Sequence, residues 1–137
     1  MDGRKKHHKI KSRIALAALL VYMSFFVQAH AVEIVSGRYL SISATEITLE
    51  VKVGSPAPAS IIIIQHLPQG TTPTAADPPY KKFNTKKGEV RWLLRKVPPG
   101  TLSLQLKLSA PVNPEQISAE IRCMDPATGK LVTTQVK

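Results

Sequence analysis

Histidine and cysteine are the side chains best suited to act as nucleophiles, bases or metal ligands, and both are scarce in this sequence. Cys123 is the only cysteine, and His66 is the only histidine after residue 30. One histidine completes neither a zinc site nor a Ser/His/Asp triad, and no base is marked beside Cys123. We therefore expect no catalytic residue, no metal and no cofactor. Cys123 is interpreted as a small buried strand residue, with an intermolecular disulfide as the alternative.

A basic cluster is the second chemical feature. It could bind an acidic glycan or another polyanion, because lysines around Tyr80 and Phe83 combine positive charge with rings for stacking. The alternative is a solvated loop whose lysines protect a sheet edge. The candidate anion-binding residues are Lys81, Lys82, Lys86, Lys87 and Arg91.

An isoleucine run supplies an apolar candidate site. Residues 61–64 are four consecutive isoleucines, so a strand here must place apolar side chains on both of its faces. Leu93 interrupts the polar face of its own strand in the same way. We expect Ile62, Ile64 and Leu93 to form an apolar patch for a protein partner, or a surface covered by the N-terminal segment of the chain.

Strands must position these residues. Apolar and polar side chains alternate over residues 46–53, 90–94, 102–108 and 117–123, and Pro/Gly turns separate these segments. The pattern predicts an all-β fold, an immunoglobulin-like antiparallel sandwich of two sheets with about seven strands. Within it we expect an edge strand or two short pieces over residues 32–43, with a break near Ser36-Gly37. We also expect a mainly loop region over residues 71–88 with one short strand near its start, and a hairpin turn over residues 125–130.

The first 31 residues have the pattern of a secretory signal peptide. A basic start precedes an apolar run over residues 14–27, and Ala29 and Ala31 are the small residues expected at a cleavage site. The run is short for a membrane span of about 20 residues, so cleavage is favoured over retention as an anchor. We expect an exported protein, periplasmic or secreted, with residues 32–137 as its one domain and no permanent membrane span after cleavage.

The leader also changes the charge of the protein. The whole chain has 19 Lys/Arg and 9 Asp/Glu, and the leader holds six and one of these, which leaves 13 against 8, or about +5. Half of the formal net charge of +10 therefore lies in the predicted signal peptide and not in the mature domain. We expect no nucleic-acid partner.

The order of strand and turn motifs over residues 44–110 resembles that of a known protein family. The motifs are an alternating strand, Pro-Ala-Pro-Ala at 56–59, the isoleucine run, Leu-Pro-x-Gly at 67–70, Gly-x-Val-x-Trp-x-Leu at 88–94 and Pro-Gly-Thr at 99–101. This succession resembles the immunoglobulin-like repeat module of bacterial surface proteins called domain of unknown function number eleven. The resemblance implies a non-enzymatic structural or protein-interaction module of the cell envelope, for adhesion or assembly. The acidic-glycan module remains the alternative.

Overall fold

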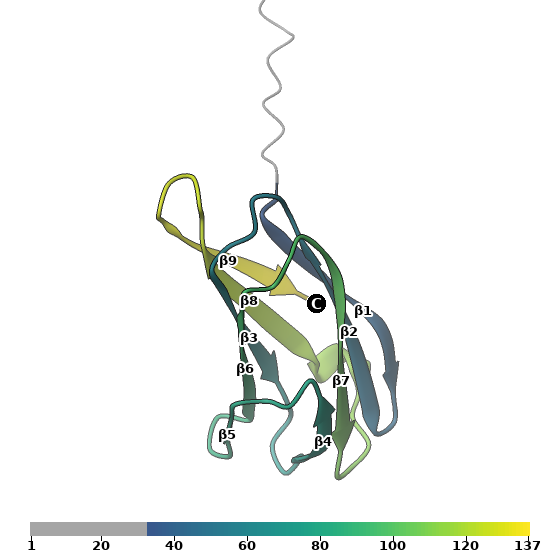
Figure 1. Ribbon diagram of the computed structural model, residues 1–137. Helices are drawn as coiled ribbons and strands as arrows, with labels where there is room; N and C mark the ends of the chain where they lie inside the picture. The colour runs from purple at the N-terminus through teal and green to yellow at the C-terminus, as the bar shows by residue number, and fades with distance from the viewer. Residues whose placement is uncertain (1–32) are drawn as a thin grey trace, which may run out of the picture. The chain divides into compact units, whose positions relative to one another are not determined.

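The computed structural model describes residues 33–137, which form nine strands and one short 3-10 helix (Figure 1). The elements are β1 (Val35–Ser43), β2 (Glu46–Val53), β3 (Ser60–His66), β4 (Pro73–Asp77), β5 (Lys82–Asn84), β6 (Glu89–Arg95), β7 (Gly100–Leu108), η2 (Pro114–Gln116), β8 (Ser118–Met124) and β9 (Leu131–Val136). Both predicted cleavage residues, Ala29 and Ala31, lie outside the described residues. No helix within residues 33–137 is long and apolar enough to cross a membrane.

The strands form where apolar side chains recur at every second position. In β2, Ile47, Leu49 and Val51 are buried and the residues between them face solvent. In β7, Leu104 and Leu106 continue the same inner face. Because the side chains of a strand point alternately to its two faces, this pattern leaves one face of each sheet for a shared core and the other for solvent.

Two antiparallel sheets enclose that core (Figure 1). One has the strand order β1-β2-β7-β4 and the other has the order β5-β6-β3-β8-β9. The first corresponds to the A-B-E-D sheet of immunoglobulin domains, and β3-β8-β9 correspond to C-F-G, with β6 and β5 extending that sheet. The predicted immunoglobulin-like sandwich of two antiparallel sheets is therefore confirmed.

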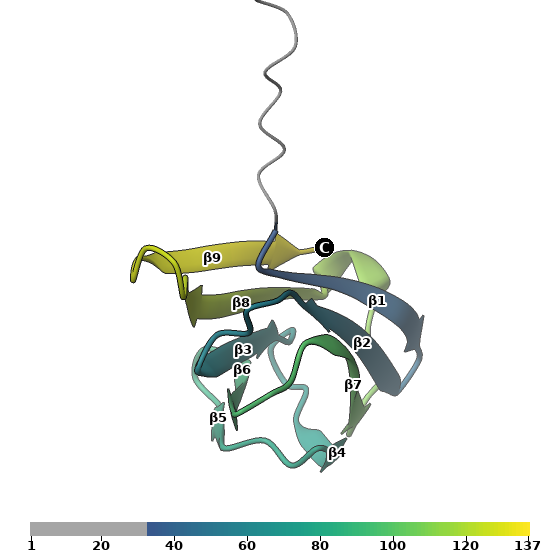
Figure 2. The ribbon, with the colours of Figure 1, turned by 45° about the horizontal axis from the view of Figure 1, so that its top comes forward.

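One side of the sandwich is closed by β1, which lies beside β9 (Figure 2). The Thr134 hydroxyl donates to the Val35 carbonyl across this junction at 3.3 Å. Gly37 permits the close approach, since a Cβ built on it would lie 2.7 Å from Ile121 Cδ1 and 2.8 Å from Val136 Cγ2. A side chain at this position of β1 would push the two sheets apart.

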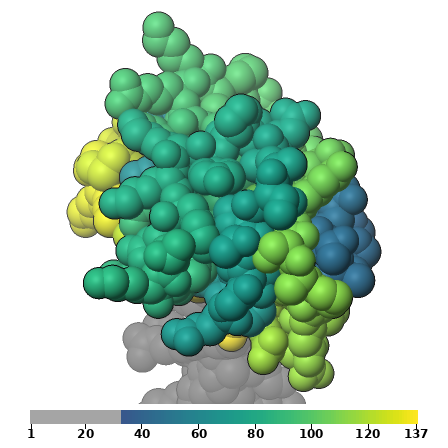
Figure 3. Space-filling view, turned by 90° about the horizontal axis from the view of Figure 1, so that it is seen from below, coloured from purple at the N-terminus to yellow at the C-terminus, as the bar shows by residue number. Residues whose placement is uncertain are grey.

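The β4–β6 region covers one end of the core. The Trp92 indole is buried and donates to the Pro78 carbonyl at 2.8 Å, and the Tyr80 ring meets it edge-on with a centroid separation of 6.4 Å. Seen from this end, the teal and green central part of the chain spreads over most of the surface (Figure 3). The hydrogen bond and the aromatic contact fasten this covering segment to β6.

Two local expectations were wrong, namely the number of strands and the break in the first strand. The structure has nine strands rather than about seven: β4 is the short strand expected near the start of residues 71–88, and β5 is an additional strand in the region expected to be loop. The first segment is an edge strand, as one alternative expected, but no break occurs at Ser36-Gly37. β1 is continuous, and its irregularity is a bulge at Leu40, between the pairs Tyr39↔Leu49 and Ser41↔Thr48. The turn over residues 125–130 is confirmed, with Gly129 at φ +68° and the Asp125 carboxylate accepting from the Ala127 N–H.

Candidate functional site

The outer face of the five-stranded sheet carries both sets of candidate residues. Ile62 of β3 pairs with Leu93 of β6, and the next outward position, Ile64, pairs with Arg91. Arg91 in turn pairs with Lys82 of β5. The apolar and basic candidates are distant in the sequence, yet the register of β5, β6 and β3 makes them neighbours on one surface.

The three apolar candidates differ in exposure. Ile62 and Leu93 are half-buried, whereas Ile64 is only 3% exposed. Ile64 is flanked across the sheet by Arg91 and Glu120, whose long side chains can lay their apolar stems over it. The accessible part of the predicted patch therefore centres on Ile62 and Leu93.

Two further apolar side chains on this face were missed by the sequence analysis. Met124 and Leu131 are cross-strand partners in β8 and β9, and they are 51% and 63% exposed. In β8, Ile121 and Cys123 face the core. Because side chains alternate along a strand, Met124 faces outward, as Glu120 and Arg122 do. The alternation of inward and outward residues in this strand could have shown from the sequence that Met124 is exposed. We name Ile62, Leu93, Met124 and Leu131 the outer apolar patch.

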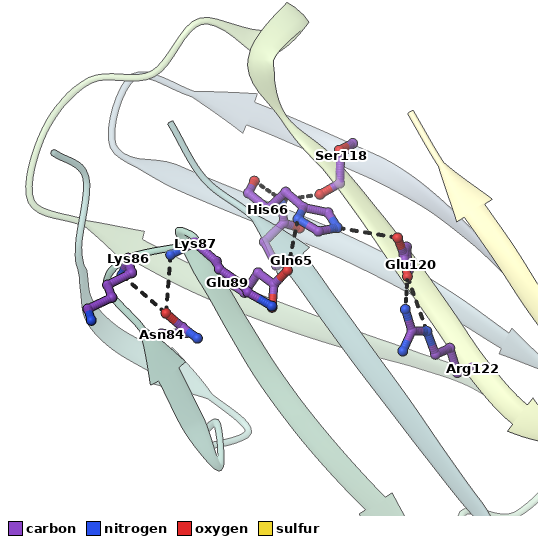
Figure 4. A network of polar contacts seen from close by, with 9 residues as sticks. All are labelled: Gln65, His66, Asn84, Lys86, Lys87, Glu89, Ser118, Glu120 and Arg122. Carbon is purple, nitrogen blue, oxygen red and sulfur yellow. Dashed lines mark hydrogen bonds and ion pairs between the residues drawn. The ribbon is translucent and has the colours of Figure 1, made fainter. Parts of the chain in front are cut away.

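The basic candidates lie on the β5–β6 hairpin. Lys82 is on β5, and the Lys81 backbone N–H donates to the Arg91 carbonyl at 2.8 Å. The Asn84 side-chain oxygen accepts from the backbone N–H groups of Lys86 and Lys87, both at 3.1 Å, which holds the turn in shape (Figure 4). All four lysines and Arg91 are exposed. The hairpin thus presents five cations within a short stretch of chain.

An acidic side chain lies among these cations. The polar hollow beside the hairpin is lined by Lys82, Asn84, Glu89 and Arg91. The carboxylate of Glu89 would repel an anion that entered this hollow. Glu89 thus offsets part of the positive charge that Lys82 and Arg91 bring to this hollow, whereas the lysines outside it have no carboxylate among the residues that line it.

His66 lies between two carboxylates on the same sheet face (Figure 4). Its Nδ1 is 3.9 Å from Glu89 Oε1, and its Nε2 is 3.6 Å from Glu120 Oε1. Arg122 donates twice to Glu120 Oε2, at 3.1 and 2.7 Å, and these hydrogen bonds lower the pKa of the Glu120 carboxyl. The cluster therefore combines acidic and basic groups, and it pairs Arg122 within the chain.

These groups do not assemble into a metal or thiol site. Within residues 33–137 no three His, Cys, Asp or Glu side chains are placed to hold a metal ion. Cys123 points into the core with 5% exposure, on the opposite side of the sheet from His66, and burial raises the pKa of its thiol. Among the described residues, the Cys123 thiol therefore has no base beside it in His66.

The opposite face of the sandwich is polar. The outward positions of β2 and β7 carry Thr48, Glu50, Lys52, Ser103, Gln105 and Lys107. Glu50 accepts from the Arg38 guanidinium at 2.8 Å. The outer apolar patch therefore distinguishes the five-stranded sheet from the four-stranded one.

No known protein-family model matches this chain, and no curated protein matches it either.

Proposed function

We propose that this chain is an exported, non-enzymatic immunoglobulin-like domain that serves as a structural or protein-interaction module of the bacterial cell envelope. Its leader sequence supports export, and its resemblance to the repeat module of bacterial surface proteins supports the envelope. The observation that carries the interaction role is the outer apolar patch. Apolar side chains gathered on one sheet face, beside charged ones, are typical of a surface that another protein covers.

The interaction role can be tested by affinity purification from envelope extracts of the bacterium that encodes the chain. A tagged wild-type protein should retain a stoichiometric protein partner in moderate salt, and Ile62→Lys should lose it. Ser103→Lys is the matched control, because Ser103 is an exposed outward residue of the other sheet. Equal retention by wild type and Ile62→Lys, with both proteins folded, would argue against the patch.

The export step has a separate test. We expect the mature protein to begin near Val32, after cleavage following Ala31. Intact-mass measurement of the protein from the envelope fraction checks this. A mass that includes residues 1–31 would favour retention of the apolar run as an anchor.

Binding of an acidic glycan or other polyanion is the second candidate function. The observation in its favour is the set of exposed cations on the β5–β6 hairpin, namely Lys81, Lys82, Lys86, Lys87 and Arg91. We expect retention on heparin to collapse with modest salt and to disappear when the four lysines are replaced by alanine, because exposed charges are screened over about 10 Å at 0.1 M salt. Unchanged retention of the quadruple variant would exclude the hairpin as the site.

A further inference from the structure

We propose that the outer apolar patch, together with Arg91 and Arg95, binds a segment of a partner protein in which apolar side chains alternate with or adjoin carboxylates. This inference rests on the proposed interaction function and adds the chemistry of the partner. It also moves the centre of the surface from the isoleucine run toward the β8–β9 hairpin.

The apolar side chains of the patch lie on the outward face of four neighbouring strands. Leu131 of β9 pairs with Met124 of β8. Arg122 is the next outward-facing residue of β8, and it pairs with Ile62 of β3. Ile62 pairs with Leu93. The register therefore places the four apolar residues along a diagonal band from β9 to β6 on the outer face of the sheet, with Arg122 beside Met124 and opposite Ile62. Met124 and Leu131 offer the most exposed apolar area in the band, and the unbranched thioether of Met124 adapts to the shape of a partner.

The basic side chains on the β6 border of this band have no acidic partner within residues 33–137. The ion pairs in this part of the chain involve Arg38, His66 and Arg122, and none of them includes Arg91 or Arg95. Arg95 lies two residues from Leu93 on the same face, and Arg91 lies two residues from it on the other side. A partner that covered the patch would reduce the solvation of both guanidinium groups, so it has to supply carboxylates to them.

A protein segment fits this face better than an anionic membrane surface. Glu89 and Glu120 lie on the same face as the arginines. An anionic lipid surface would meet these two carboxylates as well as the arginines, whereas a protein can place charges of both signs in register with them.

Site-specific photocrosslinking in the encoding bacterium tests the inference. The full chain carries a photoreactive residue at position 124 or 131, and a matched control carries it at position 40. Leu40 is as exposed as Met124, at 51%, but lies at the bulge of β1 in the other sheet. We expect positions 124 and 131 to crosslink to a partner peptide that contains apolar residues next to at least two Asp or Glu. Mass spectrometry of the crosslinked peptides identifies it.

Charge reversal supplies the second readout. Arg91→Glu combined with Arg95→Glu should lower the crosslinking yield at position 131 about tenfold, because two attractive contacts become repulsive. Lys52→Glu combined with Lys107→Glu is the control, since it changes the net charge equally on exposed positions of the other sheet. Trp92 fluorescence verifies that both variants are folded.

The outcomes separate this inference from the proposed function. Crosslinks at positions 124 and 131 to an acidic, apolar peptide, reduced by the arginine reversal alone, support it. Crosslinks there to lipid, to a peptide without carboxylates, or with a yield that the reversal leaves unchanged, overturn it. Crosslinks to a protein only from position 40 overturn it and leave the interaction function standing. The absence of any protein crosslink from all three positions overturns both.

Discussion

At the scale of single residues, Gln65 is a buried polar side chain whose hydrogen bonds join three strands. It is buried on the inner face of β3, where it accepts from the Tyr39 hydroxyl at 2.9 Å and donates to the carbonyls of His66 and Ser118, both at 3.0 Å. Its amide thereby links β1, β3 and β8. Within residues 33–137 no buried side-chain nitrogen or oxygen lacks a hydrogen-bond partner, so this network is fully satisfied.

Gln65→Leu should lower the free energy of unfolding by about 1–3 kcal/mol, because it leaves the Tyr39 hydroxyl and two carbonyls without their partner. Urea denaturation followed by Trp92 fluorescence measures the change. Gln105→Leu, at an exposed position of β7, should stay within about 0.5 kcal/mol of wild type. Equal effects of the two substitutions would mean that the Gln65 hydrogen bonds contribute nothing.

The buried phenol of Tyr39 should make the stability of the fold depend on pH in the alkaline range. Burial raises the pKa of its phenol from 10.0 to about 12, and the hydrogen bond to Gln65 acts in the opposite direction. Because the folded state favours the neutral phenol, its contribution to stability is complete below pH 10 and is lost as the pH rises toward 12. The difference in unfolding free energy between wild type and Tyr39→Phe should therefore shift in favour of Tyr39→Phe between pH 9 and pH 12. A constant difference would show that Tyr39 ionises as freely in the folded protein as in the unfolded one.

At the scale of elements, the junction of β1 with the opposite sheet depends on a missing side chain. Gly37→Ala should destabilise the fold by about 1–3 kcal/mol, because the new Cβ would meet Ile121 Cδ1 at 2.7 Å and Val136 Cγ2 at 2.8 Å. Ile121→Val removes the Cδ1 atom involved. In a double-mutant cycle measured by urea denaturation, the combined variant should be more stable than the sum of the two single changes. Strict additivity would mean that β1 moves away freely and is not held against Ile121.

The strands that the sequence predicted are those with clear alternation. β2, β6, β7 and β8 follow from side-chain parity alone, and parity also placed Ile62 and Leu93 on an outward face. The short β5 was missed because it has only three residues, and its pairing with β6 does not follow from side-chain alternation within so short a segment. The same limit explains why the two candidate sets were treated as separate sites, although Arg91 and Ile64 are direct cross-strand partners. Met124 was passed over because it was treated as the end of a strand and not as part of its outer face.

At the scale of the whole molecule, the described domain is held together by one core without a covalent crosslink. Its inner faces contribute buried side chains from both sheets, and Cys123 is a free thiol among them. Small domains of this size are stable by only about 5–15 kcal/mol, and here burial of apolar area must supply that margin. Loss of packing at any part of the core should therefore affect the entire sandwich.

Cys123 and Trp92 provide two probes of this cooperativity. Both side chains are buried in the core, on β8 and β6, with β3 between the two strands. We expect the denaturant midpoint for reaction of the Cys123 thiol with a maleimide pulse to coincide with the midpoint for Trp92 fluorescence, because the thiol becomes accessible only when the sandwich opens. Added reductant should leave the fluorescence midpoint unchanged. Labelling of Cys123 well before the fluorescence transition would instead mean that the β8–β9 hairpin, which carries Met124 and Leu131, opens independently of the rest of the core.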